Sequence, residues 1–221
     1  MTRRKIKTAA MKLFAEKGLE AVSVRDINKA AGQRNAGSIN YHFSSRDDLI
    51  REIMMDVGKI LDDDHSARLD RIEATGGPRS IRDVADVLVS PSLTAAVDQQ
   101  ENRHSLRFLQ MAVMSHRDML MEAMDNSPGL NRCLDHLRRM APEMPEDLLD
   151  HRIRLGMKFL LITGSAREQA LQDGDNSDPY WQEQWAPGNV EDAFVGIITA
   201  PVSPQTQTLF DQRDDTQDLA S

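Results

Sequence analysis

A stretch of about twenty residues, 23–43, constrains the fold most because it combines a helix start, a helix stop and a second helical pattern. Ser23 and Asp26 have the spacing of a capping box, in which each side chain bonds an unpaired amide at the start of a helix. Gly32 is expected to end this helix, since Gly enters the left-handed conformation at little steric cost. A second helix is predicted at about 36–43. Two short helices joined by a tight turn indicate a helix-turn-helix unit.

The second predicted helix leaves four hydrogen-bonding side chains on its outer face, namely Ser38, Asn40, Tyr41 and His42. A helix this short is not stable alone, and its polar face suits the major groove of DNA. Asn can bond bidentately to adenine, whereas Ser, Tyr and His side chains reach phosphates and base edges. The alternative interpretation is the surface of a small helical hairpin, because helix-turn-helix lookalikes are common.

The residues around this unit follow a family pattern. From Arg4 onward, over about residues 3–51, the chain resembles the amino-terminal domain of TetR-type bacterial transcriptional regulators. The matching residues are Ile6, Ala9, Ala10, Leu13, Phe14, Gly18, Val24, Ile27, Ala30, Ala31, Gly32, Tyr41, His42, Phe43 and the run from Ser45 to Leu49. The chain departs from the pattern at Asn40, where the family usually has Tyr, and in a 33–36 loop that is one residue longer than usual. The resemblance implies that Arg46, where the family usually has Lys, holds a phosphate.

The predicted DNA-binding surface combines the outer face of the second helix with basic residues that precede it. Arg25 and Asn40 are the expected base readers by their chemistry, and the other side chains position the protein on the DNA backbone. The basic residues at the start of the chain either form a mobile, solvated arm or reach phosphate or a minor groove. The full predicted set is Arg3, Arg4, Ser23, Arg25, Ser38, Asn40, Tyr41, His42 and Arg46.

Charge is divided unevenly along the chain, although its net value of −8 would by itself argue against nucleic acid. Residues 1–51 carry eleven Lys and Arg against five Asp and Glu, a balance of +6. Of the totals of 27 and 35, this leaves 16 against 30 in the remainder, a balance of −14. A basic head can hold phosphates, while an acidic remainder discourages nonspecific wrapping of DNA.

Composition and periodicity predict an all-α fold, because 40% of residues are hydrophobic, only 5% are aromatic, and few short alternating runs occur. We expect an N-terminal three-helix DNA-binding domain with the helix-turn-helix, followed by a larger C-terminal helical domain for effector binding and dimerisation. The expected boundaries are 1–48 for the head and 49–200 for the body. The polar segment 201–221 is expected to be a disordered tail.

A long connecting helix of roughly 28 residues is predicted from Ser45, which has capping-box spacing with Asp48, to a stop at 75–78. Further helices are predicted at 80–89, before a break at Pro91, and then at 99–116, 118–124, 127–140, 145–171 and 190–200. The long helix at about 146–171 is apolar on more than one face. We therefore expect it and the helix at 190–200 to form a homodimer interface.

A small-molecule site is expected in the body, since the family resemblance implies a cavity enclosed by helices. Eight of the twelve Met residues lie between Met111 and Met157, and Met adapts its shape to varied apolar ligands. Each of these residues could equally be ordinary core filling. The candidate lining residues for a small, substantially apolar effector are Phe108, Met111, Met114, Met121, Met157 and Leu161.

Other chemistry finds little support in the sequence. The six His residues are scattered without metal-ligand spacing, so no metal site or cofactor is expected, and the 62–64 run of Asp is expected to be a solvated helix face. The sequence shows no catalytic constellation. The lone Cys133 cannot form an internal disulfide, and neither a signal core nor a membrane span is evident, so we expect a cytoplasmic protein.

The function expected from these features is a TetR-like, homodimeric repressor that binds an inverted-repeat operator in double-stranded DNA and is released by a small apolar ligand. Two alternatives stay open. The first is a DNA-binding regulator without a small-molecule effector, and the second, with less support, is an enzyme with an unrecognised site.

Overall fold

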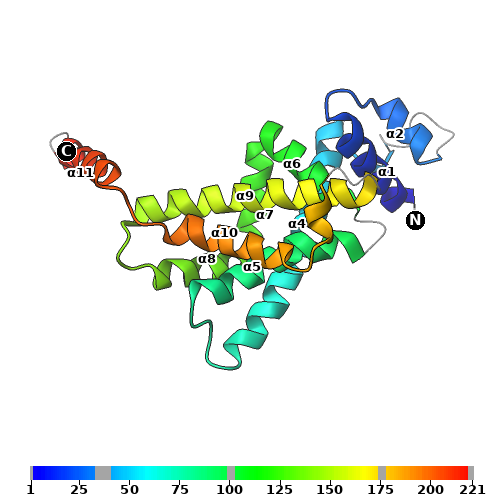
Figure 1. Cartoon of the computed structure of the whole chain (residues 1–221). Helices are drawn as coiled ribbons and strands as arrows, with labels where there is room; N and C mark the ends of the chain where they lie inside the picture. The colour runs from blue at the N-terminus through cyan, green and yellow to red at the C-terminus, as the bar shows by residue number, and fades with distance from the viewer. Residues whose placement is uncertain (1, 33–40, 99–102, 174–177, 219–221) are drawn as a thin grey trace.

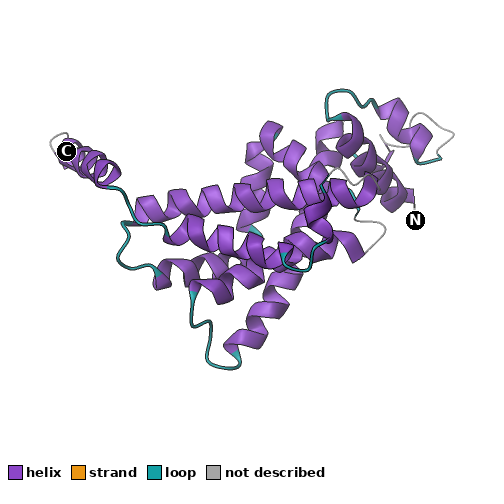
Figure 2. Cartoon of the chain, in the orientation of Figure 1, coloured by secondary structure: helices purple, strands orange, loops and turns teal. Residues whose placement is uncertain are grey.

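The computed structural model describes residues 2–32, 41–98, 103–173 and 178–218. Every regular element in these ranges is a helix, which confirms the predicted all-α class (Figure 2). A small group of helices at the N-terminal end forms the head. The remaining helices form a larger body, in which long helices lie side by side (Figure 1).

The head begins with α1 (Thr2–Lys17) and α2 (Val24–Ala30). The predicted capping box of α2 is present, because the Asp26 amide donates to Ser23 Oγ at 3.2 Å and the Ser23 amide donates to Asp26 Oδ2 at 3.1 Å. Gly32 follows α2 with φ +67°, as a left-handed stop requires. Most of the second predicted helix, 36–43, lies outside the described residues, although Tyr41 and His42 are helical.

The connecting helix is α4 (Arg46–Glu73), whose 28 residues extend about 42 Å from the head into the body. Ser45 caps it as predicted, accepting from the Asp48 amide at 3.0 Å. The reciprocal bond differs from an ordinary capping box, since the Asp48 carboxylate accepts from the amide of Ser44 at 2.9 Å. Gly76 and Gly77 follow the helix with φ +109° and +85°, so the predicted stop is confirmed.

After α4, the described part of the body contains a series of helices, of which α9 is as long as α4. In chain order they are α5 (Ile81–Asp98), α6 (Ser105–Ser115), α7 (Arg117–Asp125), α8 (Pro128–Met140), α9 (Glu146–Asp173), the 3-10 turn η2 (Pro179–Gln182) and α10 (Ala186–Thr199). Helices α5, α9 and α10 pack against one another around the buried ring of Phe194. Gly156 on α9 provides the space, because a Cβ there would lie 2.7 Å from that ring.

Helix α5 corrects the predicted break at Pro91, which lies inside a continuous helix. Proline removes one backbone donor from a helix interior. Here the neighbouring Ser92 hydroxyl donates to the Leu88 carbonyl at 3.3 Å, and the helix buries an apolar face that includes Val84 and Val87. Tertiary burial therefore outweighs the local helix-breaking tendency of proline.

The C-terminal segment corrects the expectation of a disordered tail, because α11 (Pro204–Asp218) is helical. Ser203 caps it, accepting from the Thr206 amide at 3.2 Å. The helix extends away from the body after Pro201 (Figure 1). The low hydrophobicity of this segment correctly predicts that it adds little to the core. It gives no information on the local capping residue that starts a helix.

Two hydrophobic clusters organise the chain, and they do not divide it at the expected boundary of residue 48. The first cluster contains Ile6, Phe14 and Ile27 from the head together with Phe108 of α6. The Phe14 and Phe108 ring centroids are 6.0 Å apart. The second cluster surrounds Phe194 in the body. Helix α6 is thus part of the core of the head as well as a neighbour of α9.

Candidate DNA-binding surface

Exposed side chains of the head lie on α1, on α2 and on the short helical segment that follows residue 40. Arg25 on α2 is exposed, and Tyr41 is 86% exposed. The Tyr41 ring meets His42 edge to face at 5.0 Å, while Phe43 is buried in the head and anchors this segment. A buried Phe with outward polar neighbours is the arrangement that the helix-turn-helix prediction requires at this end.

The predicted set of nine residues is only partly placed. Ser38 and Asn40 lie outside the described residues, so their orientation stays a prediction. Ser23 is exposed, but its hydroxyl already serves as the cap of α2. His42 is half-buried next to Phe43.

Arg46 points toward the core of the head. Its guanidinium donates to the carbonyl of Leu19 and lies 5.3 Å from the centre of the Phe14 ring. A cation above an aromatic face gains about 0.5–1 kcal/mol at an exposed site. Arg46 therefore joins α4, α1 and the turn after α1, and contact with a phosphate would have to use its remaining N–H groups.

The basic residues of α1 are also engaged within the chain. Arg3 forms an ion pair with Glu52 on α4, and its guanidinium lies 4.6 Å from the centre of the Phe43 ring. Arg4 is exposed. Helix α1 already includes Arg3, so the solvated arm considered for the start of the chain is helical here from Thr2 onward.

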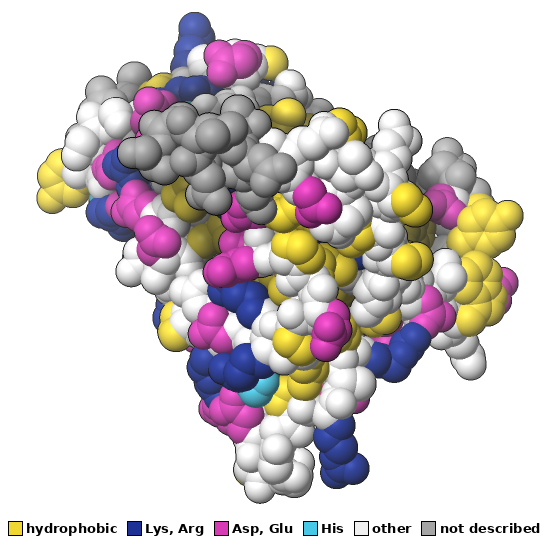
Figure 3. All heavy atoms as spheres, turned by 90° about the vertical axis from the view of Figure 1, so that its left-hand side faces the viewer, with side chains coloured by type: hydrophobic (Ala, Val, Ile, Leu, Met, Phe, Trp, Pro, Cys, Tyr) yellow, Lys and Arg dark blue, Asp and Glu magenta, His cyan; other side chains and the backbone are white. Residues whose placement is uncertain are grey.

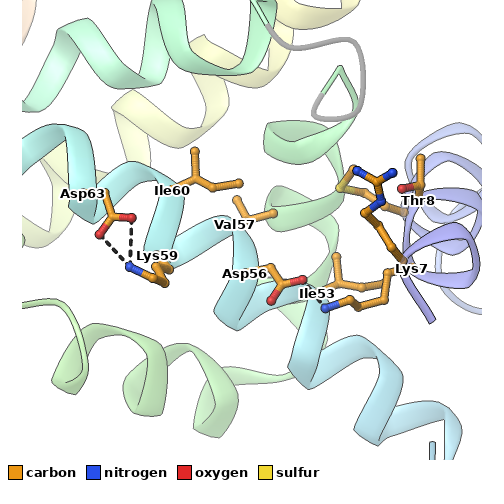
Figure 4. A pocket seen from close by; sticks show the side chains of 10 residues that line it. Lys7, Thr8, Ile53, Asp56, Val57, Lys59, Ile60 and Asp63 are labelled. Atoms are coloured by element: carbon orange, nitrogen blue, oxygen red, sulfur yellow. Dashed lines mark hydrogen bonds and ion pairs between the residues drawn. The ribbon is translucent and has the colours of Figure 1, made fainter. Parts of the chain in front are cut away.

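A groove of about 350 Å³ lies between α1 and α4 (Figure 4). Its charged side chains are paired across or along the groove, with Lys7 bound to Asp56 and Lys59 bound to Asp63. Buried apolar side chains form part of its lining, including Met11 and Ile53. The pair of Lys7 with Asp56 attaches α1 to the connecting helix, so the orientation of the head depends on that of α4.

The six predicted effector residues are distributed over different environments. Phe108 is buried and Met111 half-buried in the cluster that includes the head, whereas Met157 packs against the body cluster. Leu161 is half-buried on α9. Met114 and Met121 lie at the surface, 85% and 49% exposed.

The Asp run at 62–64 corrects the expectation of a uniformly solvated face. Asp63 is exposed, but Asp62 is buried and accepts from the amides of Gly129 and Leu130 at 3.2 and 2.8 Å. It therefore caps α8 from another helix. Gly129 allows this approach, because a Cβ there would lie 2.8 Å from the Ser66 amide nitrogen on α4.

Glu168 on α9 is a second buried acid that sequence reasoning missed. Its carboxylate accepts from the amides of Leu106 and Arg107, at 3.1 and 3.2 Å, in the first turn of α6. From the periodicity of α9, Glu168 is recognised only as one of several charged residues on the helix. Its acceptor role depends on α6, which lies more than sixty residues earlier in the chain.

No group of three or more His, Cys, Asp or Glu side chains that could hold a metal ion occurs among the described residues. None of the described helices combines the length and apolar character that crossing a bilayer requires. Cys133 is buried, and burial raises the pKa of its thiol to about 12.

Comparison with known proteins gives a family match for the head. The family model for bacterial regulatory proteins of the tetR family matches residues 6–53, which include most of α1, all of α2 and the start of α4. Over these residues the chain is similar to regulators of the tetR family, the family that the sequence predicted. It is accordingly a DNA-binding transcriptional regulator, and the sequence-based prediction of its family and fold class is confirmed.

Two curated proteins are similar to this chain in sequence. The HTH-type transcriptional regulator AcrR of Shigella flexneri is 27% identical over 172 residues, which cover 71% of this chain and 73% of that protein. The HTH-type transcriptional repressor KstR2 of Rhodococcus jostii (strain RHA1) is 49% identical over 45 residues, or 20% of this chain and 22% of that protein.

Solved structures show that the TetR-type fold continues beyond the head. A putative tetR family transcription regulator from Shewanella sp. PV-4 has a TM-score of 0.62 at 19% identity, covering 89% of this chain and 97% of that chain. A TetR family regulator from Marinobacter aquaeolei VT8 has a TM-score of 0.57 at 17% identity, covering 87% of this chain and 94% of that chain. The body therefore shares its architecture with these regulators.

Proposed function

We propose that this TetR-family regulator is a cytoplasmic homodimer that represses transcription from an inverted-repeat operator and releases the DNA when a small, substantially apolar ligand binds the body. The observation that carries the proposal is the capped, rigidly anchored head. Its α2 and the Tyr41 segment expose polar side chains while Ile27 and Phe43 are buried. We assign no catalytic residue, because the polar groups of the head fit DNA contact rather than covalent chemistry.

The DNA contacts are proposed to come from the predicted set, with Arg25 and Asn40 reading bases and Arg3, Arg4, Ser23, Ser38, Tyr41, His42 and Arg46 positioning the head. Exposure of Arg25 and Tyr41 supports this assignment. Selection of bound sequences from a random DNA library would test it. Recovery of two related half-sites with two-fold symmetry is the expected result, and recovery of no preferred sequence would contradict operator recognition.

Dimerisation is proposed through α9 and α10. Leu155 and Ile162 on α9 are exposed in the single subunit, and Ile197 on α10 is half-buried. Ile198, on the helix at 190–200 that the sequence assigned to the interface, is fully buried in the core of its own subunit. A two-fold dimer would present two heads to the two half-sites.

The interface is tested by placing charge on its exposed apolar residues. Leu155→Glu and Ile162→Glu together should produce folded monomers with much weaker operator binding, because two charges would be buried at the interface. Leu209→Glu on α11 is the matched control, since Leu209 is exposed on a helix that extends away from the body. If the double variant still sediments as a dimer, the interface is formed by other residues.

The effector site is proposed between α6 and α9, which pack together and carry Phe108, Met111, Met157 and Leu161. Met114 and Met121, at the surface, are the least supported members of the predicted set. A ligand can release the DNA only if it binds the DNA-incompetent arrangement more tightly, and operator must then weaken ligand binding by the same factor. A thermal-shift hit would therefore be titrated with and without operator. Equal ligand affinities would favour the alternative of a regulator without a small-molecule effector.

A further inference from the structure

Glu168 is an acid in an unusual position, because it is only 2% exposed and has no Lys or Arg bonded to its carboxylate among the described residues. It accepts instead from two backbone amides of α6, those of Leu106 and Arg107. A carboxylate at this place also interacts favourably with the positive end of the helix dipole. These contacts compensate part of the free energy of removing the charge from water.

Helix α6 has no comparable cap of its own. His104 precedes the helix and makes no side-chain capping bond. Four amides at the start of any α-helix lack intrahelical partners, and leaving them buried without acceptors destabilises the helix end. The acceptor therefore comes from α9, so the position of α6 along its own axis depends on a side chain of the body.

Helix α6 also contacts the head directly. Phe108, which follows the capped residues by one position, is fully buried and meets Phe14 of α1 at a centroid distance of 6.0 Å. Phe14 in turn lies under the guanidinium of Arg46 at the start of α4. A continuous series of contacts thus runs from Glu168 on α9, through α6 and Phe14, to the first residue of the connecting helix.

We propose that Glu168 is a positioning residue for DNA binding, which fixes the start of α6 and thereby sets the orientation of the head relative to the body. Losing the two acceptor bonds would allow α6 to shift or unwind at its first turn. Phe108 would then no longer hold Phe14 and Arg46 in the arrangement that binds operator. This inference rests on the DNA-binding function and adds a residue that lies in the body, outside the predicted DNA-binding surface.

The surroundings of the carboxylate make its role open to a pH test. Burial raises the pKa of Glu168 to about 7, and Arg107 on α6 is the charged side chain that opposes this rise. Next to Glu168 on α9, Arg167 donates to the Leu93 carbonyl of α5. The pKa of His104, which precedes α6, is lowered mainly by burial. Near pH 8 Glu168 is ionised and accepts from both amides, whereas near pH 6 its protonated oxygen opposes one of them.

The decisive variant is Glu168→Gln, which keeps the size of the side chain but replaces one acceptor oxygen by an N–H₂ group. It should remain a folded dimer and bind operator more weakly, by between about 5-fold and 150-fold, the usual range for coupling between distant sites. The probe is the operator recovered from the random library. Failure of the wild-type protein to bind any sequence would count against the DNA-binding assignment, not against Glu168 alone.

Asp62→Asn is the matched control. Asp62 is also buried and also caps a distant helix through two amides, but α8, the helix it caps, belongs to the body cluster and not to the cluster around the head. Similar thermal destabilisation of both variants with weaker operator binding only for Glu168→Gln supports the proposal. Equal loss of operator binding by both variants would overturn it, because the effect would then be general destabilisation.

The pH profile supplies a readout that a purely structural role would not change. Operator affinity of the wild-type protein should rise between pH 6 and pH 8 relative to Glu168→Gln, and Asp62→Asn should retain this rise. The ratio of wild-type to variant affinity isolates Glu168 from every other titrating group. A ratio that is constant over this pH range would overturn the proposal even if Glu168→Gln were to fold poorly.

Discussion

The head and the body of this regulator are specified in different ways. In the head, helix ends are fixed by residues three positions apart, as in the Ser23 and Asp26 capping box, and by a glycine stop at Gly32. In the body, two helix starts are fixed by buried acids on other helices, Asp62 for α8 and Glu168 for α6. Local signals define the part that meets DNA, whereas contacts between distant segments define the part expected to respond to a signal.

This difference has consequences for how each part tolerates change. A local cap limits the effect of a substitution to its own helix end, at about 0.5–2 kcal/mol. A buried acid that bonds another helix affects both helices, since its removal leaves unpaired amides in the interior. Substitutions in the body should therefore destabilise more distant helices than substitutions in the head do.

The largest expected effect separates the core of the body from its surface. Ile198→Glu should prevent folding or destabilise the subunit by more than about 4 kcal/mol, because it buries an unpaired charge among fully buried neighbours. Ile197→Glu, one position along α10 and half-buried, should leave the subunit folded. Urea denaturation followed by circular dichroism distinguishes them, and a similar loss for both variants would contradict the placement of Ile198 in the core.

The next effect concerns the connection between head and body. Phe14→Ala should cost about 3–5 kcal/mol, as expected for a buried aromatic side chain. It removes the contacts with Phe108 and Arg46, so the head should open while the body remains folded. Hydrogen exchange would show faster exchange confined to α1 and α2. Uniformly faster exchange over the whole chain would mean that head and body unfold together.

A smaller effect is expected at Asn40, the proposed base-reading position of the head. Asn40→Ala should weaken operator binding by about 1–3 kcal/mol and relax preference at one base pair of each half-site, because a bidentate contact with a base edge is lost. Binding to a panel of single-base operator variants measures this directly. If affinity and preference are both unchanged, Asn40 does not read a base.

The last effect is a pH dependence that belongs to the body. His65 on α4 is buried, burial lowers its pKa below the ordinary 6.5, and neither ring nitrogen makes a hydrogen bond of ordinary geometry, although the Leu88 backbone lies close enough to act on the ring. A lowered folded-state pKa means that the unfolded chain binds more protons, so stability is lost as the pH falls through 6.5. Thermal unfolding of His65→Leu should lose less stability than the wild type between pH 7 and pH 5.

Glu168 acts in the opposite direction over part of the same range. Its folded-state pKa of about 7 lies above the ordinary 4.5, so its contribution to stability is lost as the pH rises from 4.5 through 7. The two groups therefore oppose each other in the wild-type profile. If His65→Leu has the same pH dependence as the wild type, protonation of His65 is not what destabilises the protein in acid.

The sequence predicted the features that short-range chemistry determines. The cap at Ser23, the stop at Gly32 and the start of α4 after Ser45 follow from neighbouring residues, and all three are confirmed. The prediction failed where a local tendency is overridden by packing. A proline inside a helical pattern normally ends the helix, yet Pro91 is buried within α5 and the helix continues past it.

The roles of Asp62 and Ile198 could not be read from their neighbours. The periodicity of α4 places Asp62 in a run of three acids, and only the approach of α8, allowed by Gly129, reveals it as a buried cap. Ile197 and Ile198 are both apolar and adjacent, so the sequence does not say which of them faces the core. Such distinctions depend on contacts across more than forty residues of sequence.

The ion pairs along α1 and α4 also bear on how operator binding responds to ionic strength. At least four of the eleven Lys and Arg residues in the first 51 positions are already paired with acids of the same chain. They are Arg3 with Glu52, Lys7 with Asp56, Lys12 with Glu16 and Arg51 with Glu122. Each phosphate that a protein neutralises changes log K by about −0.9 per unit of log salt concentration, through release of counterions. Cations that keep their carboxylate partners add little to that release, so added salt should weaken operator binding less steeply than eleven basic residues imply.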